Sequence, residues 1–229
     1  MKTIGMIAAM PEETEHILSL LGKEISSGII SGYQVKEFKV YGKKIILINS
    51  GIGEISAAAA TMLLIDRYKV RTIINFGLSG ALKSGIKLND MLIVKDIVHY
   101  DFDISAFCDN LKGAYPGYDT AFFETDKELR ELADRAAGTV LNKVRIASGD
   151  KFIASSETKE RLISDFDADI CDMEAAGIAI TAARAEIPVL FIKTISDLAD
   201  ECATSSISDK ISRGVTDYKV LIDNLLRLI

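Results

Sequence analysis

Short runs of continuously apolar residues alternate along the chain with segments of helical periodicity. Such runs are typical of strands that are buried on both faces of a sheet. A hairpin adds two further strands around the turn Tyr41-Gly42-Lys43. The predicted strands are Thr3–Ala9, Tyr33–Val40, Lys44–Asn49, Thr72–Phe76, Met91–Val98, Val144–Ser148 and Val189–Ile195.

The segments between these strands repeat their apolar residues about every 3.6 positions, which predicts helices. The predicted helices are Glu12–Leu21, Glu54–Tyr68, Asp126–Leu141, Glu157–Phe166, Met173–Ala185 and Ser208–Leu228. Alternating strands and helices indicate an α/β fold with a mainly parallel sheet covered on both faces. No repeat, linker or shift of composition divides the chain, so we expect one domain over residues 1–229.

Composition narrows the classes of function. The 229 residues are 48% apolar and 26% charged, a mixture typical of globular proteins and not of disordered chains. The net charge of −6 argues against a nucleic-acid partner, because non-specific binding needs a basic face. The longest apolar stretch, Ile55–Ile65, is interrupted by Ser56 and Thr61 and is shorter than the ~18 residues of a membrane span. We therefore expect no membrane partner.

Cysteine and histidine usage points to a cytoplasmic protein without a metal. Cys108, Cys171 and Cys202 are widely spaced and form no CxxC pair, so we expect small, buried side chains in a reducing compartment. His16 and His99 are too few and too far apart for a histidine-based zinc site. The N-terminal residues lack the long apolar segment and cleavage site of a signal peptide.

Acidic residues follow two of the predicted strands, where α/β sheets bind their ligands, and a third lies at the start of a predicted helix. Glu13 follows the first strand, Glu174 opens a helix, and Asp197 follows the last strand. An acid in a first helical turn is also explained by the helix dipole. A carboxylate that faces a cleft can instead act as a general acid or base, or accept hydrogen bonds from a vicinal diol. Both interpretations remain open for Glu13 and Glu174.

Two glycine-rich segments and one aromatic residue also follow predicted strands. Ser50-Gly51-Ile52-Gly53 and Gly77-Leu78-Ser79-Gly80 each follow a strand, where glycines form a tight turn or bring backbone N–H groups to a ligand. Phe152 follows another strand and either stacks on a planar base or fills the core. Each signal is weak alone, but together they predict a cleft at one rim of the sheet.

The chain resembles the nucleoside phosphorylase/nucleosidase superfamily and, within it, the nucleosidases that act on 5′-methylthioadenosine and S-adenosylhomocysteine. The resemblance covers essentially the whole chain and implies a single-domain, three-layer α/β/α fold with a central mixed, twisted sheet. It is carried by Ala9-Met10-Pro11-Glu12-Glu13, Ser50-Gly51-Ile52-Gly53, Asn75-Phe76-Gly77-Leu78-Ser79-Gly80, Ser148-Gly149-Asp150-Lys151-Phe152-Ile153, Asp172-Met173-Glu174-Ala175 and Ile195-Ser196-Asp197-Leu198-Ala199-Asp200, in family order and spacing.

This resemblance implies hydrolysis of the N-glycosidic bond of 5′-thio-adenosines, with release of adenine and a 5-thioribose. Asp197 would protonate purine N7, Glu13 would activate the attacking water, and Glu174 would bind the ribose hydroxyls. No cofactor is implied, because the leaving group and the water need only acids and bases.

The remaining implied contacts surround the nucleoside. Phe152 would stack on adenine, the Ile153 backbone would read its edge, and Met173 would pack under the sugar. Leu78 and Lys193 would lie near the water, and Ser79, Gly80 and Ser196 would also contact the substrate. Met10, Ile52 and Ile207 would line the 5′-thio pocket, which Ile104, Phe107 and Pro116 of a neighbouring subunit would complete in a homodimer.

Several positions depart from the family pattern and keep alternatives open. Leu78 stands where a small polar residue is usual, Lys193 where Arg is usual, Ile207 where an aromatic residue is usual, and Ser79 where Ala is common. The alternatives are a phosphorylase, a hydrolase of another adenine nucleoside such as aminodeoxyfutalosine, and a catalytically weak nucleoside-binding protein. Asn75 occupies the position of a phosphate-binding Arg in the phosphorylases, and the anionic Glu13 would repel phosphate, so water is favoured as the nucleophile.

Overall fold

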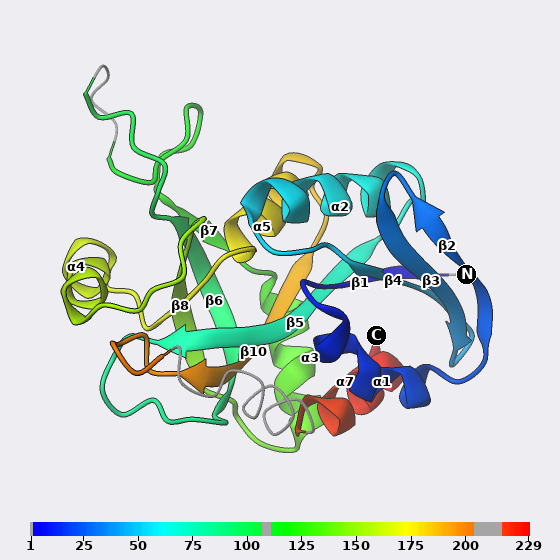
Figure 1. Cartoon of the computed structure of the whole chain (residues 1–229). Helices are drawn as coiled ribbons and strands as arrows, with labels where there is room; N and C mark the ends of the chain where they lie inside the picture. Colours follow the sequence, from blue (N-terminus) through cyan, green and yellow to red (C-terminus); the bar gives the residue numbers. More distant parts are fainter. Residues whose placement is uncertain (1, 107–110, 204–216) are drawn as a thin grey trace.

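The computed structural model describes residues 2–106, 111–203 and 217–229, in which strands and helices alternate (Figure 1). The strands are β1 (Thr3–Ala8), β2 (Glu24–Ile30), β3 (Tyr33–Val40), β4 (Lys43–Asn49), β5 (Thr72–Ala81), β6 (Met91–His99), β7 (Phe122–Glu124), β8 (Lys143–Ser148), β9 (Ile170–Asp172) and β10 (Val189–Asp197). The helices are α1 (Pro11–Leu21), α2 (Glu54–Asp66), α3 (Lys127–Ala137), α4 (Ser156–Phe166), α5 (Ala175–Arg184) and α7 (Asp217–Leu228).

The strands of the described residues form one ten-stranded sheet. On one side β5, β1, β4, β3 and β2 follow one another, and β1 is parallel to both β4 and β5. On the other side β5 pairs with both β9 and β10, and β6 and β8 connect β10 back to β9. The strands β5, β10, β6, β8 and β9 therefore close into a ring. The strand pattern predicted a mainly parallel sheet, and this prediction is wrong. Strand β9 is antiparallel to β5, and β6 is antiparallel to β10. The mixed sheet implied by the resemblance is confirmed.

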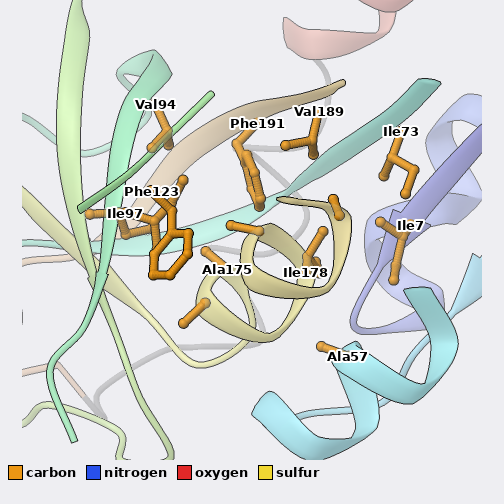
Figure 2. Packing of buried hydrophobic residues seen from close by; sticks show 14 of the residues in the cluster. Ile7, Ala57, Ile73, Val94, Ile97, Phe123, Ala175, Ile178, Val189 and Phe191 are labelled. Atoms are coloured by element: carbon orange, nitrogen blue, oxygen red, sulfur yellow. The ribbon is translucent and has the colours of Figure 1, made fainter. Parts of the chain in front are cut away.

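Two helical layers cover this sheet (Figure 1). Helices α2 and α5 lie side by side on one face, where Ala57 and Ile178 pack near Ile7, Ile73 and Phe191 (Figure 2). Helices α1, α3 and α7 cover the opposite face with the buried residues Ile17, Leu21, Leu129, Ala133, Leu221 and Leu225. Burying aliphatic side chains on both faces contributes ~25 cal/mol for each Å² of apolar surface removed from water. Helices on both faces of one sheet confirm the predicted three-layer arrangement (Figure 1).

Three strands were not predicted, and β5 is longer than predicted by five residues. Strand β2 is an edge strand that is exposed at nearly every position, so it lacks the buried alternation of a half-covered strand. Strands β7 and β9 span three residues each, too few for a period to be visible. Strand β5 continues to Ala81, although Gly77 and Gly80 favour a turn there. The structure thus corrects the predicted glycine-rich turn to an extended strand.

The remaining expectations have mixed outcomes. Helix α7 begins at Asp217, and the predicted helical residues 208–216 lie outside the described residues. Cys171 is buried as expected, Cys202 is exposed against the expectation, and Cys108 also lies outside the described residues. None of the helices in the described part of the chain is long and apolar enough to cross a membrane.

Candidate active site

A cavity of about 210 Å³ opens where β1, β5 and β10 end, facing the segments that follow β8 and β9. The predicted site residues that line it are Met10, Glu13, Ile52, Leu78, Ser79, Gly80, Phe152, Ile153, Met173, Glu174, Ser196 and Asp197. It is also lined by Ala9, Lys151, Cys171 and Asp172, which were not predicted. The strand-end motifs, far apart in the sequence, therefore meet in one place.

Glu13 is a buried carboxylate at the start of α1. Pro11 begins the helix, and the Glu13 side chain folds back so that Oε2 accepts from the N–H of Met10 at 2.9 Å. Its Oε1 accepts from the N–H of Leu78, in the neighbouring β5, at 3.0 Å. Burial raises the pKa of this carboxyl, although the Met10 N–H and the charge of Lys193 oppose the shift. The helix dipole is a sufficient explanation for the exposed Glu12. It does not explain the hydrogen bond between Glu13 and β5.

Asp197 reaches the cavity from the end of β10. The register between β10 and β5 shifts between Ile195 and Asp197, and a bulge of this kind redirects the side chains beside it. The Asp197 carboxylate accepts from Ser196 Oγ at 2.7 Å and from the Ala199 N–H at 2.9 Å. These two bonds hold the buried carboxyl at the cavity wall.

The glycines of β5 make room for both carboxyls. A Cβ at Gly77 would lie 2.6 Å from Glu13 Oε1, and a Cβ at Gly80 would lie 2.9 Å from Asp197 Oδ1. Both distances are too short for a side chain, so only glycine allows each carboxyl to lie against the strand. Because a strand rises ~3.3 Å per residue, the two positions lie roughly 10 Å apart along β5. The cavity therefore has one carboxyl beside each of two well-separated positions of the same strand.

Glu174 caps the start of α5 and faces the same cavity. Its Oε1 accepts from the N–H of Gly53 at 3.0 Å, and Gly53 adopts a positive φ of 102° to present that group. Burial and then the charge of Asp172 raise the pKa of Glu174 to about 7. The carboxylate retains acceptor capacity for hydroxyl groups in the cavity.

Lys193 lies behind the cavity lining and not in it. Its Nζ forms an ion pair with Asp172 Oδ2 at 2.8 Å, and both side chains are only 2% exposed. Burial alone would lower the pKa of the ammonium, but the charges of Asp172, Glu174 and Glu13 raise it above its usual value. One buried cation thus balances three surrounding carboxyls.

Phe152 and Ile153 follow β8 and have opposite environments. Phe152 is 46% exposed and lines the cavity, so it is not a core residue. Ile153 is buried and packs in the cluster that contains Leu162 and Phe166 of α4. This arrangement leaves the face of an aromatic ring open at the cavity, suited to stacking on a planar base.

The model of the phosphorylase superfamily matches residues 3–227. The chain belongs to the phosphorylase superfamily.

Similar proteins support the same resemblance at full length. A 5′-methylthioadenosine/S-adenosylhomocysteine nucleosidase of Buchnera aphidicola is 34% identical over 232 residues, 97% of this chain and 98% of the relative. An aminodeoxyfutalosine nucleosidase of Helicobacter pylori is 34% identical over 229 residues, with the same coverage of 97% and 98%. The structure of the 5′-methylthioadenosine/S-adenosylhomocysteine nucleosidase from Helicobacter pylori with butyl-thio-DADMe-Immucillin-A matches with a TM-score of 0.94 and 31% identity. That match covers 100% of this chain and 99% of the other.

Within the phosphorylase superfamily, a phosphate site needs cations, and this cavity offers few. No arginine lines it in the described part of the chain, and the lysine that does, Lys151, is paired with Asp101 at 3.4 Å. Asn75 is buried, and its Nδ2 donates to the Ile7 backbone oxygen at 3.0 Å. The side chain of Asn75, where the resemblance to the phosphorylases would place a phosphate-binding arginine, therefore bonds to the neighbouring strand β1. Between residues 2 and 203, apart from 107–110, and in α7, no cluster of acidic, cysteine or histidine side chains could hold a metal.

The predicted residues of the 5′-thio pocket are only partly brought together. Met10 and Ile52 line the cavity. Ile104 and Pro116 do not; they belong to the connection between β6 and β7, whose described parts project from the body of this phosphorylase-superfamily chain (Figure 1). Phe107 and Ile207 lie outside the described residues.

Asp172 is a site residue that the sequence analysis did not single out. It lines the cavity and holds Lys193, and its place directly before Met173-Glu174 could have marked it. Cys171, beside Gly80 and Asp197, carried no such signal, because β9 was not predicted.

Gly77→Ala should displace the Glu13 carboxylate from β5. A misplacement of about 1 Å in a catalytic group can cost roughly 10²-fold in rate, and we expect a loss of about that size in kcat. Gly28→Ala is the matched control, because it lies in the exposed strand β2 and a Cβ there would have no neighbouring atom within 4 Å. Adenine release by the two variants decides the prediction; equal, undiminished rates would show that Glu13 tolerates the methyl group or does not act.

Proposed function

We propose that the chain is a nucleosidase that hydrolyses the N-glycosidic bond of 5′-thio-adenosines, such as 5′-methylthioadenosine and S-adenosylhomocysteine. The observation that carries the proposal is the pair of buried carboxyls, Glu13 and Asp197, held against Gly77 and Gly80 in the lining of one cavity. Relatives that are named for this activity match nearly the whole chain.

On the leaving-group side, Asp197 donates a proton to N7 of the purine. The bond between C1′ and N9 breaks, and its electron pair moves into the base, which departs as neutral adenine. General acid catalysis of this kind contributes about 10²–10⁴-fold. Phe152 stacks on the base, and the Ile153 backbone reads its edge. The exposed ring of Phe152 and the position of Ile153 in the cavity lining support these roles.

On the other side, Glu13 accepts a proton from water as the water oxygen bonds to C1′. The sugar passes through an oxocarbenium-like state, in which positive charge develops on the ring. The carboxyls of Glu13 and Glu174 are placed to stabilise that charge. The two N–H bonds to Glu13 fix its orientation before the reaction, so little reorganisation is needed.

Glu174 binds the ribose hydroxyls, and Met173 packs under the sugar. Glu174→Ala should therefore lower kcat/KM about 10–100-fold, since a hydrogen bond to a charged group is worth ~1.5–3 kcal/mol. The variant should also discriminate less between the parent nucleoside and its 2′-deoxy analogue than the wild type does. Both values come from steady-state rates with the two substrates. If the wild type cleaves the 2′-deoxy analogue as well as the parent, Glu174 does not read that hydroxyl.

Water is favoured over phosphate as the nucleophile. The cavity contains the carboxyls of Glu13, Glu174 and Asp197 and no arginine among the described residues. A phosphate dianion would be repelled there, whereas a water molecule can donate to Glu13.

The test is incubation of the purified protein with 5′-methylthioadenosine, with and without phosphate, while free adenine is followed by chromatography. Adenine release that does not depend on phosphate is the expected result. Release only with phosphate would make the chain a phosphorylase. Aminodeoxyfutalosine is run in parallel, because a relative bears its name; a higher kcat/KM for it would move the preferred substrate to that nucleoside.

A homodimer and a cytoplasmic location complete the proposal. The connection between β6 and β7 projects from the body of the molecule (Figure 1), and its residues Ile104 and Pro116 do not line the cavity of their own chain. Both observations suit a loop that completes the 5′ pocket of a second copy. Three widely spaced cysteines without a CxxC pair suit a reducing compartment such as the cytoplasm.

A further inference from the structure

A second group of buried polar side chains lies behind the cavity, and the mechanism above does not use all of it. Glu54 is the first residue of α2, but its side chain turns into the protein and the residue is only 5% exposed. Ser148 ends β8 and is fully buried. Asp172 ends β9 and is paired with Lys193. Glu54 and Ser148 do not line the cavity, so any role they have is indirect.

A single hydroxyl links the two acids. Ser148 Oγ lies 2.5 Å from Glu54 Oε1 and 2.5 Å from Asp172 Oδ1. A serine hydroxyl has one proton to donate, and an ionised carboxylate has none. If both acids were ionised, one of the two short oxygen–oxygen contacts would hold no proton. One of the two carboxyls is therefore protonated and donates to Ser148.

The surroundings identify which acid holds that proton. Asp172 has the ammonium of Lys193 on Oδ2, and its Oδ1 also accepts from the Ala175 N–H at the start of α5. Both oxygens of Asp172 therefore already serve as acceptors for other groups. Glu54 forms no ion pair among the described residues, and its Oε2 accepts from the Gly177 N–H. Glu54 is consequently the acid and Asp172 the carboxylate.

Helices α2 and α5 build the space for this neutral acid. A Cβ at Gly177 would overlap the Glu54 backbone oxygen and would lie 3.0 Å from Glu54 Oε2. The backbone N–H of Glu54 is fixed by Asp150 Oδ1 at 2.8 Å. The backbone of Glu54 is thus fixed by Asp150, and its carboxyl is fixed by the Gly177 N–H on Oε2. These two bonds direct the other carboxyl oxygen, Oε1, toward Ser148.

We propose that Glu54 is a positioning residue for the reaction: its protonated carboxyl donates to Ser148, Ser148 donates to Asp172, and this chain fixes Lys193 beside Glu13 and Glu174. The catalytic part of this inference rests on the proposed nucleosidase function. The protonation of Glu54 does not, and it can be tested without a substrate.

Loss of the Glu54 proton has a predictable direction. Burial and then the charge of Asp172 raise the pKa of Glu54 to about 8. Above that pH a new negative charge appears beside Asp172, the donation to Ser148 ends, and the support of Lys193 weakens. The charged and titratable groups around Glu54 are Asp172 of β9, Glu174 at the start of α5, Lys193 of β10, Asp150 after β8, and Tyr100 and Tyr115 after β6.

The same shift affects folding stability. The pKa of Glu54 is raised from 4.5 to about 8, so the folded protein retains a proton that the unfolded chain releases. The stabilisation is complete below about pH 4.5, decreases as the pH rises, and is lost above about pH 8. A glutamine at position 54 carries no titratable proton, so its contribution to folding stability does not decrease with pH.

Glu54→Gln is the central test. The amide can donate to Ser148 and accept from Gly177 at every pH, as the protonated acid does. The melting temperature of the variant should equal that of the wild type near about pH 5 and exceed it near about pH 9. The kcat of the wild type should fall above about pH 8, and that of the variant should fall less. Glu128→Gln, an exposed acid in the first turn of α3, is the matched control and should show no such difference.

A second variant separates positioning from packing. Glu54→Leu fills a similar volume but cannot donate, so we expect kcat at neutral pH to fall about tenfold, the value of one lost hydrogen bond. Glu54→Gln should restore that loss. A difference in melting temperature between Glu54→Gln and wild type that stays constant across pH would overturn the protonation of Glu54. A Gln variant as slow as the Leu variant would overturn positioning by a neutral acid. If the wild type releases no adenine at all, the proposed function fails, while the melting comparison still decides the protonation.

Discussion

Asp197→Asn is expected to lower kcat for 5′-methylthioadenosine hydrolysis by about 10⁴-fold, the upper end for general acid catalysis. An amide cannot give its proton to N7, so adenine would have to leave as an anion. The fold accepts the change: the Asn oxygen can accept from the Ala199 N–H, and the amide nitrogen can donate to Ser196 Oγ. Substrate binding should therefore persist. Single-turnover adenine release and equilibrium binding of the nucleoside measure the two effects separately.

The control for this variant is Asp66→Asn. Asp66 ends α2 and forms an exposed pair with Lys69, which contributes little to stability. That variant should keep the wild-type rate. An unchanged kcat in Asp197→Asn would remove Asp197 from the role of general acid and leave the cavity without one on the adenine side.

Glu13→Gln is expected to lower kcat by about 10³-fold, because an amide nitrogen cannot take a proton from water. Both oxygens of Glu13 accept from backbone N–H groups, those of Met10 and Leu78. A Gln side chain has only one acceptor oxygen, so one buried N–H loses its partner, at a cost of ~1–3 kcal/mol in stability. Adenine affinity should be kept, since the proposed mechanism uses Glu13 at the sugar and not at the base. Turnover, adenine binding and thermal unfolding are measured together.

Glu12→Gln is the matched control, with the same chemical change one residue away on an exposed position. It should retain both rate and stability. If Glu13→Gln also loses adenine binding while it remains folded, Glu13 organises the whole cavity and its assignment as the water-activating base is wrong.

The long elements of the fold follow from the sequence because their periodicity is visible over many residues. Strand β10 and helix α3 are of this kind, with a buried run in one and spaced apolar positions in the other. Strand β9 is not: its three residues become a strand only because β5 and β8 lie on either side. Strand β2 pairs with β3 alone and buries almost nothing. Pairing partners, and not local preference, determine both.

The site was predictable where contiguous motifs lie at strand ends, as at Phe152 or Met173-Glu174. Gly77 and Gly80 were misjudged because glycine equally permits a turn and the close approach of another side chain. Only the positions of Glu13 and Asp197 distinguish the two. Glu54 was missed for a related reason. An acid at a helix start normally faces solvent, and its burial depends on Gly177, more than a hundred residues away in the chain.

The ring of β5, β10, β6, β8 and β9 joins strands that are far apart in the sequence, which affects the order in which the chain folds. Ser79 and Ser196, neighbours in the cavity wall, are separated by 117 positions in the sequence. Contacts of such separation form slowly, because the entropy of closing the intervening loop is lost before the contact is gained. Asp197 joins Glu13 in the cavity lining only after β10 has paired with β5, so enzymatic competence is among the last properties that the folding chain acquires.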